Sequence, residues 1–193
     1  MVVLYISSPG EVIRSTYSTS DGEVLYKAET PRSATYRTTS ILRLLPPDIP
    51  SSNTKASDSK YGLIASIDWK TGTKPPVIRY GGQEFEADDF LRMDGTRGAD
   101  GSRPRVLIAP DGKEYMWRNE EYEAQLITYD EKREVVAQFH RQQFGIFHKK
   151  CPARLEVTPE GEEILDIVLV TFIFIEKIRL GSTMGIITAA GAV

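Results

Sequence analysis

The sequence predicts an all-β fold: a closed antiparallel β-barrel of about 12 strands wrapped around one buried, apolar C-terminal helix. Short β-branched runs separated by turn signals cover most of the chain, which is typical of sandwiches and barrels. One late segment has instead the start, the length and the composition of a helix. The 193 residues are enough for one domain, so we expect a single domain over residues 1–193.

The turn signals delimit the strands. Asp21-Gly22 and Pro110-Asp111-Gly112 are strong hairpin turns, because glycine tolerates the backbone conformation that these turns need. The pattern predicts strands at residues 2–6, 14–18, 24–29, 38–45, 63–69, 76–80, 106–109, 113–118, 124–129, 134–140, 144–148 and 153–157. Segments rich in proline, glycine and serine predict long loops at residues 46–60 and 93–104.

The helix is expected from residue 159 to residue 180. Thr158 is a suitable N-cap, Pro159 fits the first helical position, and Gly181 is a candidate stop signal. Residues 164–175 are apolar on all sides of a helix, so the helix must be buried on all sides, and the strands must surround it. Its 12 apolar residues fall short of the roughly 20 that a membrane span needs. The tail at 181–193 either packs back on the barrel or forms an oligomer contact.

Three segments carry a resemblance to known proteins: the hairpin DGKEYMWR at 111–118, the strand VVAQF at 135–139, and the ending formed by 155–157 and the helix at 164–176. Over residues 2–179 the chain resembles the tubby-like superfamily, which includes the LURP-one-related proteins and the phospholipid scramblases. It is most similar to an uncharacterised family of mushroom-forming fungi. The resemblance implies phosphoinositide binding, membrane-linked scrambling or adaptor roles. The chain lacks the proline-rich and cysteine-rich segments of scramblases, which argues against scrambling.

Composition restricts the class of function. Hydrophobic residues make up 40% and charged residues 26%, as in ordinary globular proteins. The 24 basic and 27 acidic residues give a net charge of −3, which argues against a dedicated nucleic-acid binder. Charge is spread evenly along the chain, apart from one basic stretch.

The basic stretch lies between His140 and Leu155 and contains no acidic residue. Its basic residues are Arg141, Lys149, Lys150 and Arg154. Beside Phe144 and Phe147 they are suited to an anionic lipid headgroup, since each basic residue near such a surface contributes about 1 kcal/mol. The alternative is a solvated turn whose charges pair with nearby carboxylates. The leading hypothesis is a non-catalytic binding module for an anionic lipid headgroup or for a protein partner.

Two other classes of function stay open. Cys151 with His140 and His148 would make a small hydrolase or a metal-dependent enzyme, although none of the usual zinc or nucleophile motifs is present. The alternative is that the two histidines are polar residues at strand ends and that Cys151 is a small buried hydrophobic residue. The acidic pairs Glu84/Glu86 and Asp88/Asp89 fit a solvated face better than a catalytic pair. The third class is a structural or oligomeric, stress-related protein.

We expect no cofactor, no catalytic residue and no transmembrane segment. One cysteine and an N-terminus without a basic region or a long apolar run favour a cytoplasmic location. Lipid binding would make that location peripheral to a membrane.

Overall fold

The computed structural model describes residues 1–32, 37–46, 60–70, 74–95, 103–120, 123–143 and 151–190. Its strands are β1 (Val2–Ile6), β2 (Ser15–Ser18), β3 (Val24–Glu29), β4 (Arg37–Leu44), β5 (Tyr61–Trp69), β6 (Val77–Tyr80), β7 (Gln83–Glu86), β8 (Arg92–Met93), β9 (Arg105–Ile108), β10 (Glu114–Glu120), β11 (Glu123–Thr128), β12 (Val135–His140) and β13 (Arg154–Val157). The helices are η1 (Pro9–Arg14), α1 (Ala87–Phe90), α2 (Pro159–Glu162) and α3 (Leu165–Ala190).

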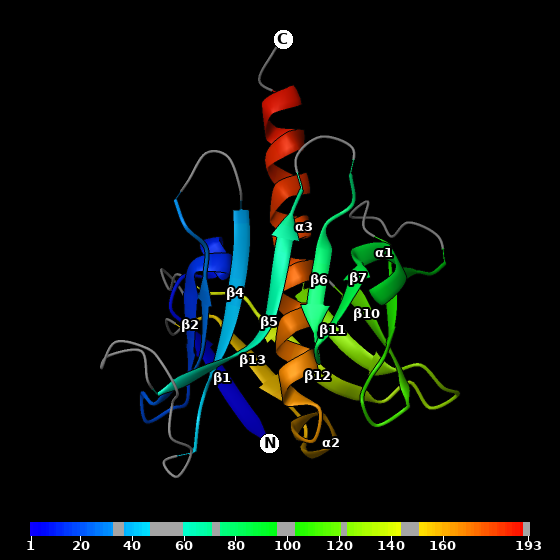
Figure 1. Cartoon of the computed structure of the whole chain (residues 1–193). Helices are drawn as coiled ribbons and strands as arrows, with labels where there is room; N and C mark the ends of the chain where they lie inside the picture. The colour runs from blue at the N-terminus through cyan, green and yellow to red at the C-terminus, as the bar shows by residue number, and fades with distance from the viewer. Residues whose placement is uncertain are drawn as a thin grey trace.

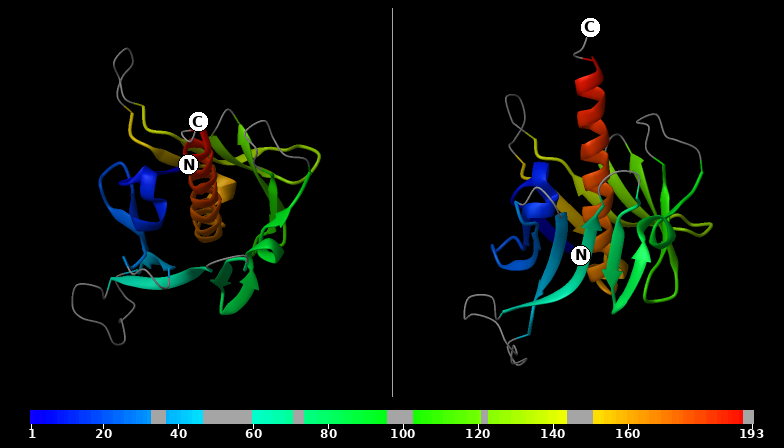
Figure 2. Two further views of the ribbon diagram at one scale, coloured as in Figure 1. Left: turned by 90° about the horizontal axis from the view of Figure 1, so that it is seen from above. Right: turned by 45° about the horizontal axis from the view of Figure 1, so that its top comes forward.

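The strands form one 13-stranded antiparallel sheet that curls around α3 (Figure 1; Figure 2, left). Neighbours in sequence are neighbours in the sheet, except β7 and β8, which are its two edges. In addition, β1 pairs with β13, so the first and last strands meet in the middle of the strand order. Eleven of the predicted strands are confirmed, two of them (2–6 and 24–29) with their exact bounds, and β7 and β8 are additional. The predicted strand at 144–148 lies outside the described residues, as do most of the two predicted loops.

Closure of the barrel is not confirmed. The strand order ends at β7 on one side and at β8 on the other, and no ladder among the described residues joins these two edges. Helix α1 connects them instead, and Ala87 and Leu91 are both fully buried at this position. A short helix with buried side chains thus lies where a closed barrel would have strand pairing.

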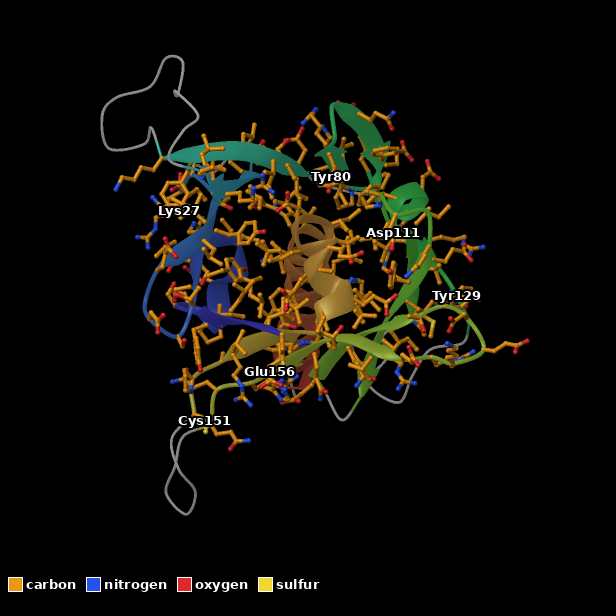
Figure 3. All side chains as sticks on the ribbon, turned by 90° about the horizontal axis from the view of Figure 1, so that it is seen from below. Lys27, Tyr80, Asp111, Tyr129, Cys151 and Glu156 are labelled. Atoms are coloured by element: carbon orange, nitrogen blue, oxygen red, sulfur yellow. The ribbon has the colours of Figure 1, made fainter. Side chains whose placement is uncertain are left out.

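Helix α3 is enclosed as its composition predicts. All eight residues from Ile167 to Phe174 are buried, which no helix lying on one layer could achieve. Phe174 stacks on Trp69 with ring centroids 5.6 Å apart, and Phe172 contacts Phe139 with centroids 5.1 Å apart. Seen from the end where α2 lies, side chains fill the space between the helix and the strands (Figure 3).

The start of the helix is confirmed, but its course differs from the prediction. Thr158 caps α2 through its hydroxyl, which accepts a hydrogen bond from the Gly161 amide at 3.4 Å, and Pro159 is at the start of the helix. The chain then makes a tighter turn through Ile164, whose amide donates to the Gly161 carbonyl, before α3 begins.

The predicted stop at Gly181 is wrong. Glycine ends a helix when its backbone turns left-handed, and Gly181 does not have a positive φ. Helix α3 therefore continues to Ala190, and its last turns extend away from the sheet rather than packing back on it (Figures 1 and 2).

Replacing Val170 with Asp is expected to abolish soluble folding. Val170 is fully buried, and an unpaired carboxylate there costs several kcal/mol, comparable with the ~5–15 kcal/mol that holds a domain together. Expression yield and circular dichroism measure the effect, and Ile108→Asp at a 66% exposed position is the control. A V170D protein that is soluble and melts normally would refute the enclosed helix.

Two glycine-to-alanine changes should have opposite effects. At Gly161 an added Cβ would lie 2.6 Å from Val157 Cγ1 and 2.9 Å from the Val136 carbonyl, so G161A should destabilise by about 1–3 kcal/mol. At Gly181 nothing lies within 4 Å, so G181A should stabilise by about 0.5–1 kcal/mol if the helix continues through it. Urea unfolding measures both, and a destabilising G181A would mean that the helix ends there.

Candidate functional site

The two ends of the sheet differ in charge, although charge is spread evenly along the sequence. Because the strands are antiparallel, alternate turns collect at opposite ends: the α2 end, and the exit end from which α3 leaves (Figure 1). Acidic residues dominate the described segments at the α2 end: Asp21, Glu23, Asp111, Glu114, Asp130, Glu131, Glu134, Glu160, Glu162, Glu163 and Asp166, against Arg43, Lys60, Lys113, Lys132 and Arg133.

Basic residues outnumber acidic ones in the described segments of the exit end. The basic residues are Arg14, Arg32, Lys70, Lys74, Arg103, Arg105, Arg118, Arg141, Arg154, Lys177 and Arg179; the acidic ones are Glu11, Glu29, Asp68, Glu86, Asp88, Asp89, Glu123 and Glu176. The predicted binding residues Arg141 and Arg154 lie at this end, while Lys149 and Lys150 are outside the described residues. The exit end is therefore the candidate functional site.

Arg154 lies on the outer face of the sheet. It is at the start of β13, where it pairs across the ladder with His140 of β12. Its Nε donates a hydrogen bond of 2.7 Å to Glu156 Oε1, and this bond is the main reason why the pKa of Glu156 is lowered. The guanidinium thus has a carboxylate partner, as the solvated-turn alternative expects, and it stays partly exposed beside the solvent.

Arg141 has a different environment from Arg154. It follows His140 directly, and alternation along a strand directs neighbouring side chains to opposite faces, so Arg141 is on the side of α3. Its guanidinium pKa is lowered, first by burial and then by the positive charge of Arg179, against the opposing effect of Glu176. The sequence predicted one basic cluster, whereas the structure divides Arg141 and Arg154 between the two faces of the sheet.

A buried ion pair on α3 is a feature that the sequence did not reveal. Glu176 is 1% exposed and accepts two hydrogen bonds from Arg179, one of them from Nε at 2.7 Å to Oε2. In the sequence, Glu176 only marked the end of the apolar run. The spacing of three residues between an acid and a base was the available signal, because such residues are neighbours on a helix.

His140 is also placed differently from its sequence interpretation as a metal ligand or a catalytic base. Its Nδ1 lies 3.4 Å from Glu123 Oε2 and its Nε2 lies 3.3 Å from Glu156 Oε2. Glu123 also accepts a hydrogen bond of 3.1 Å from the Arg141 amide. The ring therefore lies between two carboxylates that come from the strands on either side.

The arrangement of the described residues does not support the enzymatic alternative. Cys151 is partly buried and forms an isolated bridge with Gln143, and His148 lies outside the described residues. Within the described ranges, no group of three His, Cys, Asp or Glu side chains could hold a metal ion. Glu84 pairs with Arg79 at 2.7 Å and Asp88 with Arg105 at 2.8 Å, so neither acidic pair presents two free carboxylates.

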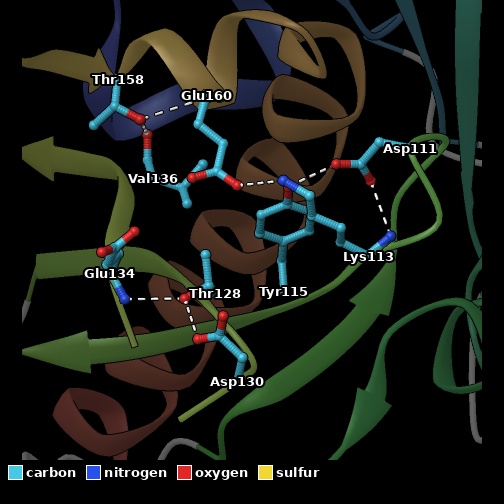
Figure 4. Close-up of polar contacts among 10 residues, drawn as sticks. Asp111, Lys113, Tyr115, Thr128, Asp130, Glu134, Val136, Thr158 and Glu160 are labelled. Carbon is cyan, nitrogen blue, oxygen red and sulfur yellow. Dashed lines mark hydrogen bonds and ion pairs between the residues drawn. The ribbon is translucent and has the colours of Figure 1, made fainter. Parts of the chain in front are cut away.

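Two pockets lie along the described surface. One of about 320 Å³ is lined by Ser7, Arg14, Ser15, Thr16, Lys27, Ala28, Glu29 and Thr30. The other, of about 510 Å³, lies at the α2 end, and Figure 4 shows polar contacts of residues that line it, Glu160 among them. There Lys113 Nζ lies 2.7 Å from Glu160 Oε1, which raises the pKa of the lysine, and Tyr115 donates a hydrogen bond of 2.7 Å to Asp111. The Lys113–Glu160 ion pair links the β9–β10 turn to α2, and the Tyr115–Asp111 hydrogen bond lies within the hairpin, so both contacts have a structural role.

The comparisons with known proteins place the chain in a family without giving it an activity. In the part of the chain that the structure describes, no helix has the length and apolarity to cross a membrane. Searches of curated proteins and of solved structures find no match. The profile of one family of unknown function, DUF6593, matches residues 11–180. The chain, its curled sheet and its enclosed helix therefore belong to the DUF6593 family.

Proposed function

We propose that this protein is a non-catalytic module that binds an anionic lipid surface with its exit end. The observation that carries the proposal is the separation of charge along the axis of the sheet. An anionic surface attracts the basic exit end and repels the acidic α2 end, so the field of the whole protein would orient it.

The interior supports a binding role better than a catalytic one. Helix α3 fills the space inside the sheet, and Ile167, Val170 and Ile173 are at most 2% exposed. A ligand would therefore bind to the outer surface of the described fold. A charged exterior around a filled interior is suited to a surface or to another protein rather than to a small enclosed substrate.

Helix α3 adds an uncharged element at the same end. Residues 181–190 contain no charged side chain, and at 1.5 Å per residue this helical segment extends about 15 Å. That length is similar to half the hydrocarbon thickness of a bilayer. An uncharged helix end that projects from the basic end of the sheet is compatible with the headgroup region of a membrane.

The resemblance to the tubby-like superfamily, and to the uncharacterised family of mushroom-forming fungi, agrees with this proposal. The superfamily implies phosphoinositide binding by a barrel with an enclosed helix. A cytoplasmic protein that associates peripherally with membranes would carry out this function.

Co-sedimentation with liposomes tests the proposal. Phosphoinositide-containing vesicles should bind the protein at low salt and less at physiological salt, and neutral vesicles should not. A variant with Lys149, Lys150 and Arg154 changed to Gln should bind roughly a hundredfold more weakly, since three basic residues contribute about 1 kcal/mol each. Arg141→Gln is measured separately, because this side chain is on the α3 side of the sheet.

The matched control changes three basic residues of the α2 end, Lys113, Lys132 and Arg133, to Gln. It alters the net charge equally and should leave binding unchanged. Equal losses in both triple variants would show that binding follows net charge rather than the exit end. No binding of the unaltered protein to any vesicle would refute the lipid proposal and would favour a protein partner.

A further inference from the structure

The pocket of about 320 Å³ opens at the exit end, where β2 begins and β3 ends. Alternation along β3 shows on which side of the sheet it lies. Tyr26 and Ala28 are buried toward α3, so Lys27 between them is on the outer face. The pocket is therefore reached from outside the described fold, at the end that carries the excess of basic residues.

Arg14 is held at this pocket and keeps hydrogen-bond donors unused. Its Nε donates a hydrogen bond of 2.9 Å to the Thr30 carbonyl, and its Nη1 donates one of 3.4 Å to Glu11 Oε1. A guanidinium has five N–H groups, so three of them have no acceptor in the described part of the chain. The side chain is 26% exposed, so the guanidinium is fixed in place and still open to a ligand.

Two serine hydroxyls in the lining form a pair that also keeps one donor. Ser7 Oγ and Ser15 Oγ lie 3.1 Å apart. Each oxygen already accepts a backbone hydrogen bond of 2.9 Å, from the Thr16 amide at Ser7 and from the Ser8 amide at Ser15. Only one of the two hydroxyl hydrogens can lie between the oxygens, so the other has no acceptor within the described ranges.

Lys27 adds a second positive charge to the lining. Its ammonium lies over the Tyr61 ring, 4.1 Å from the centroid, and no carboxylate in the described segments pairs with it. Contacts of this kind are weak where water has access, so the flexible side chain can turn to a charged ligand. Glu29 is the acidic residue among the described residues that line the pocket, and its carboxylate would oppose an anion.

We infer that this pocket binds a phosphate monoester. Such a group carries a charge of about −1.5 to −2 at neutral pH and has three acceptor oxygens. The unused donors of Arg14 and of the serine pair suit it, because hydrogen bonds to a charged acceptor are the stronger ones. A phosphate diester has less charge and fewer terminal oxygens. As a subsite for a lipid headgroup the pocket rests on the proposed function, and it adds selectivity among anionic lipids.

A titration with soluble ligands tests the pocket without any lipid. In NMR spectra the amide signals of Ser8 and Thr16 should shift when inositol trisphosphate is added, because these amides donate to the serine pair. Arg14→Gln should weaken binding about tenfold, since it removes charge-assisted hydrogen bonds. The matched control is Arg32→Gln, which removes the same charge from an exposed residue of the same end, outside the lining, and should leave binding nearly unchanged.

A third variant, Glu29→Gln, should have the opposite effect. It removes the carboxylate from the lining, so inorganic phosphate should bind about threefold more tightly, which is the effect of one charge at moderate distance in water. Misfolding cannot produce a gain of this kind. Amide signals of Ser8 and Thr16 that stay unchanged, equal losses in R14Q and R32Q, or weaker phosphate binding by E29Q would each overturn the inference.

Vesicles distinguish a lipid headgroup from a soluble phosphate. Vesicles with phosphatidylinositol bisphosphate carry monoesters, whereas vesicles with phosphatidylserine at equal surface charge carry only diesters. The unaltered protein should prefer the first kind, and R14Q should lose this preference while it still binds both kinds at low salt. Equal binding of the unaltered protein to both kinds would overturn the headgroup subsite and leave the proposed function intact. Binding of inositol trisphosphate in the pocket, without binding to any vesicle, would refute the proposed function and identify a soluble phosphate monoester as the ligand.

Discussion

A helix that is apolar on every side has to be enclosed, because any face left uncovered would keep hydrocarbon in water. One layer of strands covers only one face, so the strands must continue around α3 until no face remains. The order of the sheet meets this requirement: all strands except β7 and β8 pair with their neighbours in sequence, and β1 joins β13 to continue the sheet around the helix. Where the strands end, α1 and the residue after it take their place, with the buried side chains of Ala87 and Leu91.

Enclosure also imposes conditions on every polar group of α3. Thr171 is fully buried, and its hydroxyl donates to the Ile167 carbonyl while it accepts the indole N–H of Trp117 at 2.8 Å. Asp166, at the entrance of the buried segment, accepts from Tyr26 and from Arg43, both at 2.7 Å. Unpaired, each of these groups would cost about 1–3 kcal/mol or more, so the sheet supplies partners as well as apolar contacts.

Much of this fold could be predicted because the decisive signals are local. Turn residues such as Asp111-Gly112 mark hairpins, and a threonine before a proline marks the start of α2. The two edges of the sheet, β7 and β8, which no described ladder joins, were not predictable. They depend on how many strands the helix needs and on the burial of Ala87 and Leu91. The course of α3 beyond Gly181 was missed because glycine is a stop signal only in the left-handed conformation.

Prediction of the candidate site from the sequence has a different limit. Summed along the sequence, basic and acidic residues balance, and only alternation of the turns in space separates them. The sequence located Arg141 and Arg154 in one basic stretch, but their opposite faces follow from strand geometry. His140 and the carboxylates on either side of it belong to three strands, and Glu123 and Glu156 lie 33 residues apart in sequence, so no local pattern could have joined them.

The pairing of β1 with β13 has a consequence for how the chain folds. Most strands can pair as local hairpins soon after synthesis, but their inner faces have nothing to pack on until α3, the last element, is made. The contacts of β1 close a loop of about 150 residues, and loop closure of this kind slows folding. Folding is therefore expected to be highly cooperative and to wait until α3 has been made. A ribosome-bound or truncated chain without α3 would expose the entire inner surface of the sheet, which makes such a chain a natural substrate for chaperones.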